Sequence, residues 1–357
     1  MDLYSFTLFV TEDCNFNCTY CYQKKRKSCL DASTIEKAFG FLFPFLTRKC
    51  FINFYGGEPL LAFEQIKHAV DLVQNKNKEK KKHIQYTITT NGSLLNDKVL
   101  EFLNQHQFSL LLSFDGTIQD ITRKKGSSQY LVPMIKKILK YPSIDLEVNS
   151  IITPATIGHL ADAIQFIVGL SVPNIIFTPC RISSWDHKSL IRWEEELKVL
   201  RAFISAYYKR NKEIPLVAFR KNQKKGIFSC YAGKDRMTIM PDGKLWGCYL
   251  FADCFKEKEE SREYAKYCFG NLDEFIKDQE RIYPEILSNY SELSMDHFYT
   301  RDNLCSQCDE LHECTVCPMS NILSGSDIKT VPHWICEQNK TFIKEKRLFW
   351  KEMEGEE

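Results

Sequence analysis

The sequence of 357 residues lacks the features that place a chain in a membrane or on a nucleic acid. Its formal net charge is only +2, and no basic patch interleaved with aromatic residues suggests binding to DNA or RNA. The apolar stretch 1–10 is too short to cross a bilayer and lacks the basic start and cleavage site of a signal peptide. No pair of histidines suggests a B12 site or a mononuclear metal site. We therefore expect a globular, cytoplasmic protein that binds neither a membrane nor nucleic acid.

Cysteine, by contrast, is abundant, with fifteen residues along the chain. Disulfides are not expected in a reducing cytosol, and an odd number of thiols cannot all pair within one chain. Thiolates are the soft ligands that iron–sulfur clusters and zinc prefer. The cysteine content therefore predicts metal ligation.

The first 212 residues alternate short β-like runs with amphipathic helical segments. The predicted strands are Ser5–Val10, Phe51–Tyr55, Gln85–Thr89, Ser109–Phe114, Asp145–Ile152 and Asn174–Phe177. The predicted helices between them are Ala32–Phe45, Phe63–Val73, Asp97–Gln105, Val132–Lys140 and Ile157–Val168. Such alternation predicts an α/β fold with a parallel sheet, and six units could form a partial (β/α)6 TIM-like barrel. Reactive groups are then expected at the C-terminal ends of the strands.

A second domain is predicted at 213–357, because the alternation stops after Asn211 and cysteines become dense. Within it, Met237–Met240 and Lys244–Tyr249 flank Pro241-Asp242-Gly243, a pattern typical of a β-hairpin. We therefore divide the chain into a barrel and a smaller cysteine-rich domain.

Three cysteines, Cys14, Cys18 and Cys21, follow the first predicted strand in the pattern C-x3-C-x2-C. Three thiolates in one loop can hold three irons of a cubane and leave the fourth iron without a protein ligand. S-adenosylmethionine (SAM) can chelate that open iron, and the alternative is a zinc knuckle that lacks its fourth ligand.

This motif resembles that of the radical SAM superfamily, and further elements at later strand ends resemble the same family. They are Gly56-Gly57-Glu58-Pro59, Thr90-Asn91-Gly92 and Ser113-Phe114-Asp115-Gly116, the last followed by Asp120, Arg123 and Gly126. The resemblance implies a [4Fe–4S] cluster that cleaves SAM to a 5′-deoxyadenosyl radical. With Asn149 added from the fifth strand, the predicted SAM contacts are Tyr20 (through its backbone), Gly56, Gly57, Glu58, Asn91, Ser113, Arg123 and Asn149.

The C-terminal cysteines resemble the SPASM domain, which commonly holds two auxiliary [4Fe–4S] clusters. The resemblance assigns the outer cluster to Cys305, Cys308, Cys314 and Cys336, and the inner one to Cys230, Cys248 and Cys317. The spacing before Cys317 is one residue shorter than usual, so the inner cluster could have an open iron or a fourth ligand from Cys254 or Cys268. Structural zinc is the competing interpretation. Ordinary barrel cysteines are expected at Cys29, Cys50 and Cys180, although Cys180 could face the pocket.

Together the two resemblances imply a maturase of ribosomally made peptides that forms an oxidative cross-link, either a thioether or a carbon–carbon bond. An auxiliary cluster would accept the electron that the substrate radical must lose. The implied partners are a precursor peptide or protein, a reductant such as flavodoxin or ferredoxin, and a separate leader-binding protein. The last is expected because the sequence starts with the first barrel strand, although the barrel surface could also bind a leader.

Two other functions remain open at this stage. A sulfatase-type maturase, which oxidises Cys or Ser to formylglycine, shares the architecture but typically has an aspartate where Tyr249 stands. From another class, the chain could be a non-catalytic iron–sulfur electron carrier or a zinc-bound interaction module, and small-molecule substrates are not excluded. The general base is not identified among Glu58, Asp115, Asp253 and Tyr249.

Overall fold

The computed structural model describes residues 1–221, 230–293 and 304–355. Within them one sheet contains nine strands: β1 (Leu3–Thr11), β2 (Leu46–Gly56), β3 (His83–Thr90), β4 (Ser109–Ser113), β5 (Asp145–Ile152), β6 (Asn174–Pro179), β7 (Arg236–Ile239), β8 (Lys244–Trp246) and β9 (Cys268–Asn271). Their order in the sheet is β6-β5-β4-β3-β2-β1-β7-β8-β9. The strands β1 to β6 pair in parallel, which confirms the six predicted strands and the partial barrel.

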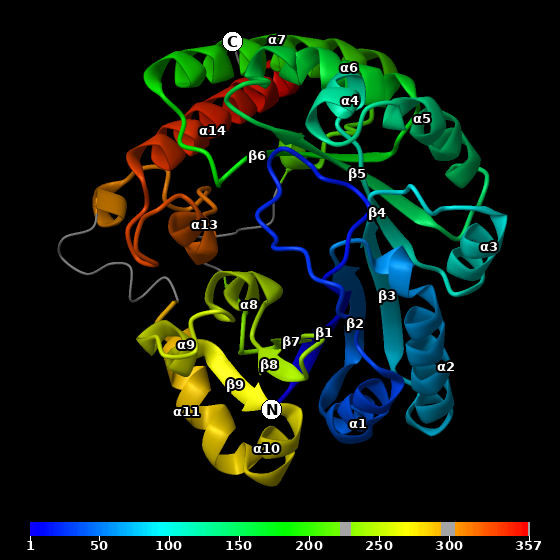
Figure 1. The fold of residues 1–357 in the computed structure, drawn as a ribbon. Coiled ribbons are helices and arrows are strands. Elements are labelled where there is room, and N and C mark those ends of the chain that lie inside the picture. The colour runs from blue at the N-terminus through cyan, green and yellow to red at the C-terminus, as the bar shows by residue number, and fades with distance from the viewer. Residues whose placement is uncertain (222–229, 294–303, 356–357) are drawn as a thin grey trace.

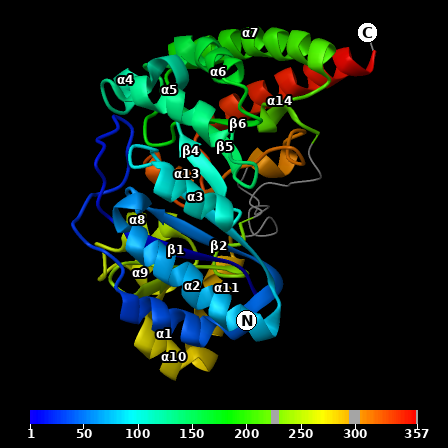
Figure 2. The same cartoon turned by 90° about the vertical axis from the view of Figure 1, so that its right-hand side faces the viewer.

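Helices follow these strands in the order the sequence predicts and cover the outer face of the curved sheet (Figure 1). They are α1 (Ala32–Leu42), α2 (Phe63–Lys80), α3 (Asp97–Gln105), α4 (Gln119–Thr122), α5 (Ser127–Ile138), α6 (Leu160–Gly169) and α7 (His187–Asn211). Several begin at a side-chain cap, as where Asp31 accepts a hydrogen bond from Thr34 N at 2.7 Å. The view in Figure 2 shows α1, α2 and α3 lying side by side in front of the strands.

The C-terminal region continues the barrel sheet instead of packing on it as a separate layer. Strand β7 pairs in parallel with β1, and β7 and β8 form the predicted hairpin. Gly243 in its turn has φ +77°, a conformation that L side chains rarely adopt. Strand β1 is therefore flanked on both sides, which fits its almost entirely buried side chains.

Six further helices lie in the described part of this region: α8 (Tyr249–Phe255), α9 (Arg262–Tyr267), α10 (Leu272–Lys277), α11 (Gln279–Ser291), α13 (Pro318–Leu323) and α14 (His333–Glu354). Helix α14 returns along α7 (Figure 1). The buried carboxylate of Glu345 pairs with Arg201 Nε at 2.7 Å, and the rings of Phe349 and Phe219 pack edge to face. The described helices are all too short or too polar to cross a membrane.

Candidate functional site

A cavity of about 750 Å³ lies at the C-terminal ends of the parallel strands. Two groups of thiols line it together, one from the loop after β1 and one from the C-terminal region, and Cys180 after β6 also lines it. The lining thiols are those of Cys14, Cys18, Cys21, Cys180, Cys230, Cys248 and Cys317. Cysteines more than 200 residues apart in the sequence thus line the same cavity, which we call the thiol pocket.

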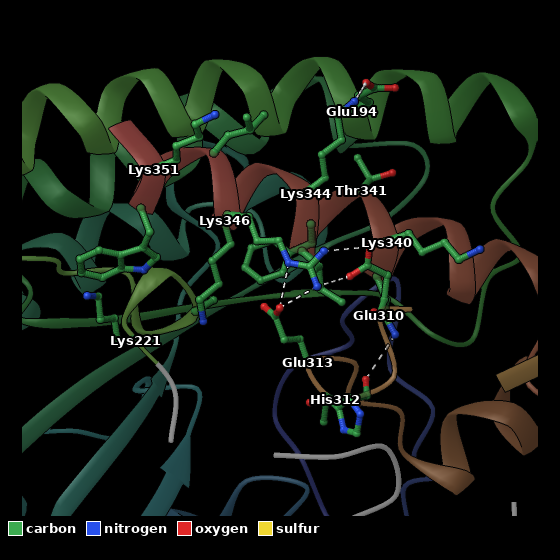
Figure 3. Close-up of a pocket in the computed structure, with 18 of the residues that line it drawn as sticks. Glu194, Lys221, Glu310, His312, Glu313, Lys340, Thr341, Lys344, Lys346 and Lys351 are labelled. Carbon is green, nitrogen blue, oxygen red and sulfur yellow. Dashed lines mark hydrogen bonds and ion pairs between the residues drawn. The ribbon is translucent and has the colours of Figure 1, made fainter. Parts of the chain in front are cut away.

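A second, larger hollow of about 1100 Å³ runs along α14 beside residues 310–315 (Figure 3). Figure 3 shows Glu310 and Glu313 pointing toward this helix, where both pair with Arg347 at 2.5 and 2.7 Å. Lys344 pairs with Glu194 at 3.3 Å. Because no thiol lines it, this groove is not the candidate site.

The loop of Cys14 is held by a very close approach of backbone to backbone. A Cβ atom on Gly57 would lie 2.3 Å from Asp13 O, and one on Gly56 would lie 2.4 Å from Thr11 O. Gly57 N donates to Thr11 O at 2.9 Å, and Glu58 N donates to Asp13 O at 2.8 Å. The two glycines, predicted to let SAM approach, are thus required by the cysteine loop itself.

We expect Gly57→Ala to displace the cysteine loop, because the added methyl group would collide with the backbone of Asp13. Overpacking of this kind costs about 1–3 kcal/mol of unfolding free energy, and the N-terminal iron–sulfur site should fill poorly. Gly40→Ala is the matched control, since a Cβ at Gly40 meets nothing within 4 Å. Denaturant unfolding and iron content measure both effects; equal stability of the two variants would contradict the account.

Glu58 is fully buried and does not line the thiol pocket. Its Oε1 accepts hydrogen bonds from Thr90 Oγ1 at 2.6 Å and Leu60 N at 3.1 Å, and its Oε2 accepts one from Asn91 N at 2.7 Å. The carboxylate therefore fixes the turn after β3. Asn91 in turn donates to Asn15 Oδ1 at 2.9 Å and steadies the cysteine loop.

Burial raises the pKa of the Glu58 carboxyl to about 7, above its ordinary value of 4.5, although its three hydrogen bonds oppose the shift. The folded state then favours the protonated form, so the contribution of Glu58 to stability is full below pH 4.5 and is lost as the pH rises through 7. We expect the difference in unfolding free energy between wild type and Glu58→Gln to fall by up to about 3 kcal/mol between pH 4.5 and 8. Glu64→Gln, at an exposed site, should show no such fall.

Arg123 is held in the thiol pocket by the buried carboxylate of Asp115. Its Nη2 donates to Oδ1 at 3.0 Å and its Nε lies 3.0 Å from Oδ2, which also accepts from Tyr20 Oη at 2.6 Å. The guanidinium opposes the effect of burial on the Cys18 thiol, whose pKa rises to about 11. Arg123 is therefore a fixed cation near Cys18. The side chain of Tyr20 is engaged with Asp115, so only its backbone is available in the cysteine loop.

The strand ends place the other predicted SAM contacts in or near the pocket. Ser113 and Asn149 line it, whereas Ser150 points to the opposite face of β5 and is buried. Asp120 caps α5 by accepting from Gly126 N and Ser128 N at 3.0 and 2.8 Å. Of the four residues considered as a general base, Tyr249 lines the pocket and Glu58, Asp115 and Asp253 do not.

Three C-terminal thiols gather at the pocket wall opposite the N-terminal loop. Burial is the main cause of the raised pKa of both Cys230 and Cys248, and the charge of nearby Cys317 adds to it in each case. Cys317 also acts on Cys254, whose pKa burial raises to about 12. Cys268 instead lies in β9, where its Sγ is 3.8 Å from Leu245 O. Between the two candidates for a fourth inner ligand, the charge interaction with Cys317 favours Cys254, although neither thiol lines the thiol pocket.

A separate group of four thiols lies at the N-terminal end of α14. Burial raises the pKa of Cys336 to about 11, and the charges of Cys305, Cys314 and Cys308 add to it. No three His, Cys, Asp or Glu side chains in the described ranges converge closely enough for a single metal ion.

Sequence reasoning missed the aromatic wall that connects the two thiol groups. Tyr22, next to Cys21, has its hydroxyl 3.4 Å from that of Tyr55, and the Tyr55 ring stacks on Tyr249 with centroids 4.1 Å apart. Tyr249 in turn follows Cys248. The adjacency of two of these tyrosines to motif cysteines was the one available signal.

Charged side chains also join the N-terminal loop to α8. Lys256 pairs with Glu12 after β1 and lies 3.4 Å from Asp253 Oδ1, and all three side chains are at least nine-tenths buried. Burial raises the pKa of Asp253 to about 6, against the opposing charge of Lys256. This ion cluster fixes the two walls of the pocket relative to each other.

A partial barrel whose first loop presents three thiols beside glycine-rich strand ends defines a class of SAM-dependent iron–sulfur proteins. The family model described as "Radical SAM superfamily" matches residues 8–167. The chain belongs to the radical SAM superfamily, whose members use SAM and a [4Fe–4S] cluster.

Among curated relatives, an uncharacterized protein of Methanocaldococcus jannaschii is 31% identical over 205 residues, which cover 56% of this chain and 71% of that protein. The "Radical SAM cyclopropyl synthase TigE" of Paramaledivibacter caminithermalis is 28% identical over 47% of this chain and 39% of its own length. A "Cysteine-type anaerobic sulfatase-maturating enzyme" of Clostridium novyi is 25% identical over 48% of this chain and 49% of its own length. The chain thus spans less than half of the last two proteins.

Solved structures share the fold over nearly the whole chain. The structure titled "Native anSMEcpe with bound AdoMet" superposes with a TM-score of 0.75 at 18% identity and covers 99% of this chain and 100% of that one. Streptococcus suis SuiB bound to the precursor peptide SuiA gives a TM-score of 0.62 at 14% identity, with 94% of this chain and 76% of that chain covered. The cysteine-rich C-terminal region therefore belongs to the shared architecture.

Proposed function

We propose that this protein is a radical SAM peptide-modifying enzyme that abstracts a hydrogen atom from a precursor peptide and forms an oxidative cross-link, a thioether or a carbon–carbon bond. Cys14, Cys18 and Cys21 would hold the SAM-binding cluster. The inner auxiliary cluster would be held by Cys230, Cys248 and Cys317, with Cys254 as the favoured fourth ligand. The outer one would be held by Cys305, Cys308, Cys314 and Cys336. These sets follow the three groups in which the thiols lie.

The observation that carries the proposal is that thiols of the first and second sets line one cavity. When bound, the N-terminal cluster and SAM supply a 5′-deoxyadenosyl radical, which removes hydrogen from an unactivated carbon. An oxidation of the resulting substrate radical needs an electron acceptor within reach of the same pocket. Cys248 lies on the wall that faces this space, where such an acceptor would be placed.

The chain's own residues would orient SAM and the peptide. Arg123, held by Asp115, presents a fixed cation next to Cys18, which suits the carboxylate of SAM. Asn91, Ser113 and Asn149 add polar groups at successive strand ends. Glu58 would act through the turn that it holds, since its carboxylate faces away from the pocket. The Tyr55–Tyr249 stack would form the surface on which the substrate side chain lies between the two clusters.

A peptide substrate is supported by SuiB, which is solved with a precursor peptide, and a carbon–carbon bond is supported by TigE, which is named a cyclopropyl synthase. A reductant such as flavodoxin or ferredoxin would supply electrons for SAM cleavage. A separate protein or the barrel surface would bind a leader segment. Cytoplasmic residence remains a prediction from the sequence.

A second candidate, the oxidation of one Cys or Ser to formylglycine, is favoured by the relatives named as sulfatase-maturating enzymes. Tyr249 stands directly after Cys248, where such maturases typically have an aspartate. Asp253 lies one helical turn further along α8, but outside the pocket lining. This difference ranks the cross-linking reaction first.

The experiment incubates the reconstituted protein with SAM, a reductant and synthetic peptides encoded beside its gene, and reads the products by mass spectrometry. A cross-link removes two hydrogens: one goes to 5′-deoxyadenosine, and the other leaves as a proton while its electron goes to the auxiliary cluster. Deuterium at the reacting carbon should therefore appear in 5′-deoxyadenosine. A product in which a cysteine's sulfur has been exchanged for oxygen would establish formylglycine formation instead. If SAM is cleaved but no deuterium passes from the peptide to 5′-deoxyadenosine, a peptide substrate is contradicted.

A further inference from the structure

Arg181 stands directly after Cys180 at the end of β6 and reaches from the barrel toward the C-terminal cysteines. Its Nη1 donates to Gln338 Oε1 at 2.6 Å, its Nη2 lies 3.5 Å from Asn339 Oδ1, and its guanidinium lies 5.9 Å from the ring centroid of Trp334. These three partners all belong to α14, close to Cys336. The residue lines the thiol pocket and is half-buried.

Among the described residues, no carboxylate balances the charge of this guanidinium. In the part of the chain that the structure describes, no carboxylate oxygen lies within ion-pair distance of Arg181, and its hydrogen bonds go to neutral amides. Burial lowers its pKa to about 10, so it stays charged at neutral pH. A cation that is partly withdrawn from water without an anion beside it is unfavourable.

Thiols are the groups that could balance this cation. Those that act on Arg181 are Cys314, from the proposed outer set, Cys317, from the proposed inner set, and its neighbour Cys180. Asn339, which Arg181 contacts, also donates to Cys314 Sγ at 3.4 Å. Cys314 and Cys317 are separated by two residues, so Arg181 lies at the junction of the two sets.

We propose that Arg181 is a positioning residue shared by both auxiliary clusters, whose negative charge it balances and whose reduction potentials it raises. The inference rests on the proposed function, since it requires two clusters at these thiols. A cubane held by thiolates is anionic and gains a further negative charge on reduction. A nearby cation stabilises the reduced form more than the oxidised form. The shared cation therefore favours uptake of the substrate electron by the auxiliary clusters.

The test measures potentials without the SAM cluster. The variant Cys14→Ala/Cys18→Ala/Cys21→Ala is reconstituted, and its auxiliary clusters are titrated electrochemically and followed by electron paramagnetic resonance, with and without Arg181→Gln. We expect Arg181→Gln to lower the reduction potentials of both clusters. At a fixed applied potential, the ratio of reduced to oxidised cluster should then fall about tenfold. Arg181→Lys should keep most of the wild-type potential, and Arg281→Gln, at an exposed site on α11, should change nothing.

Each result separates this inference from the function on which it rests. If about eight irons bind and neither potential moves, or only one does, the shared role of Arg181 is wrong while the proposed function stands. If no iron binds outside the N-terminal site, both fail. If Arg181→Gln binds less iron, the charged variant Arg181→Lys should bind as much as wild type. Equal loss of iron in the two variants would show that the charge of Arg181 is not what matters. Unchanged potentials with weaker peptide binding would make Arg181 a substrate contact instead.

Discussion

Alanine in place of Cys14, Cys18 or Cys21 abolishes reductive cleavage of SAM and removes about four irons per chain, while the other two sites stay filled. The reason is that the proposed assignment gives this cluster three thiolates from one loop as its ligands. Production of 5′-deoxyadenosine under anaerobic conditions, together with iron content, measures the effect. The loss should reach the detection limit, because without this cluster SAM has no open iron to chelate and no inner-sphere path for the electron.

Cys29 supplies the control for this experiment. It lies in the same N-terminal segment, is exposed, and is paired through its backbone to Thr11 without joining the three thiols. Cys29→Ala should keep both the iron and the SAM cleavage of the wild type. If Cys29→Ala lost as much iron as Cys14→Ala, the assignment of the cluster to these three residues would be wrong.

Replacing Cys248 separates the two halves of the reaction. Cys248→Ala should keep cleavage of SAM but lose conversion of the peptide by at least about a hundredfold, because the inner cluster would be lost and the substrate radical would have no acceptor. About four irons should disappear from a chain that still forms 5′-deoxyadenosine. Iron analysis and mass spectrometry of the peptide measure the two quantities on one sample.

The pair Cys254→Ala and Cys268→Ala identifies the fourth inner ligand. We expect Cys254→Ala to alter the signal of the inner cluster and Cys268→Ala to leave it intact, since Cys254 lies near Cys317 and Cys268 is held in β9. The reverse outcome would assign Cys268.

Peptide conversion that survives in Cys248→Ala at the wild-type rate would mean that the inner cluster is not the electron acceptor.

The barrel was predictable because its signals are local. Most of the strands β1 to β6 are rich in β-branched or aromatic residues, as Asp145–Ile152 illustrates. Amphipathic helices such as Asp97–Gln105 alternate with them. The hairpin around Gly243 was predictable for the same reason. Beyond residue 211 the helices were not foreseen. The long helix α14 is placed by its packing on α7, which is distant in sequence.

The site was predictable only as far as its motifs extend. Glycines at 56 and 57 indicated a close approach, but the approaching group is the backbone of Asp13 as well as whatever cofactor binds. Glu58, part of the same motif, faces away from the pocket because β2 ends there and the next turn captures its carboxylate. Tyr55 and Arg181 belong to no motif. Their partners, Tyr249 and Cys314, become neighbours only after the chain has folded.

The most direct test of the account is to reconstitute the wild-type protein anaerobically with iron and sulfide, count iron and zinc per chain, and add SAM with dithionite. The account predicts about twelve irons, no zinc, and the formation of 5′-deoxyadenosine. About four irons with zinc at the C-terminal cysteines would make those residues structural and would rule out oxidative cross-linking through an auxiliary cluster. A fully loaded protein that leaves SAM intact would contradict radical chemistry altogether and would favour an electron carrier.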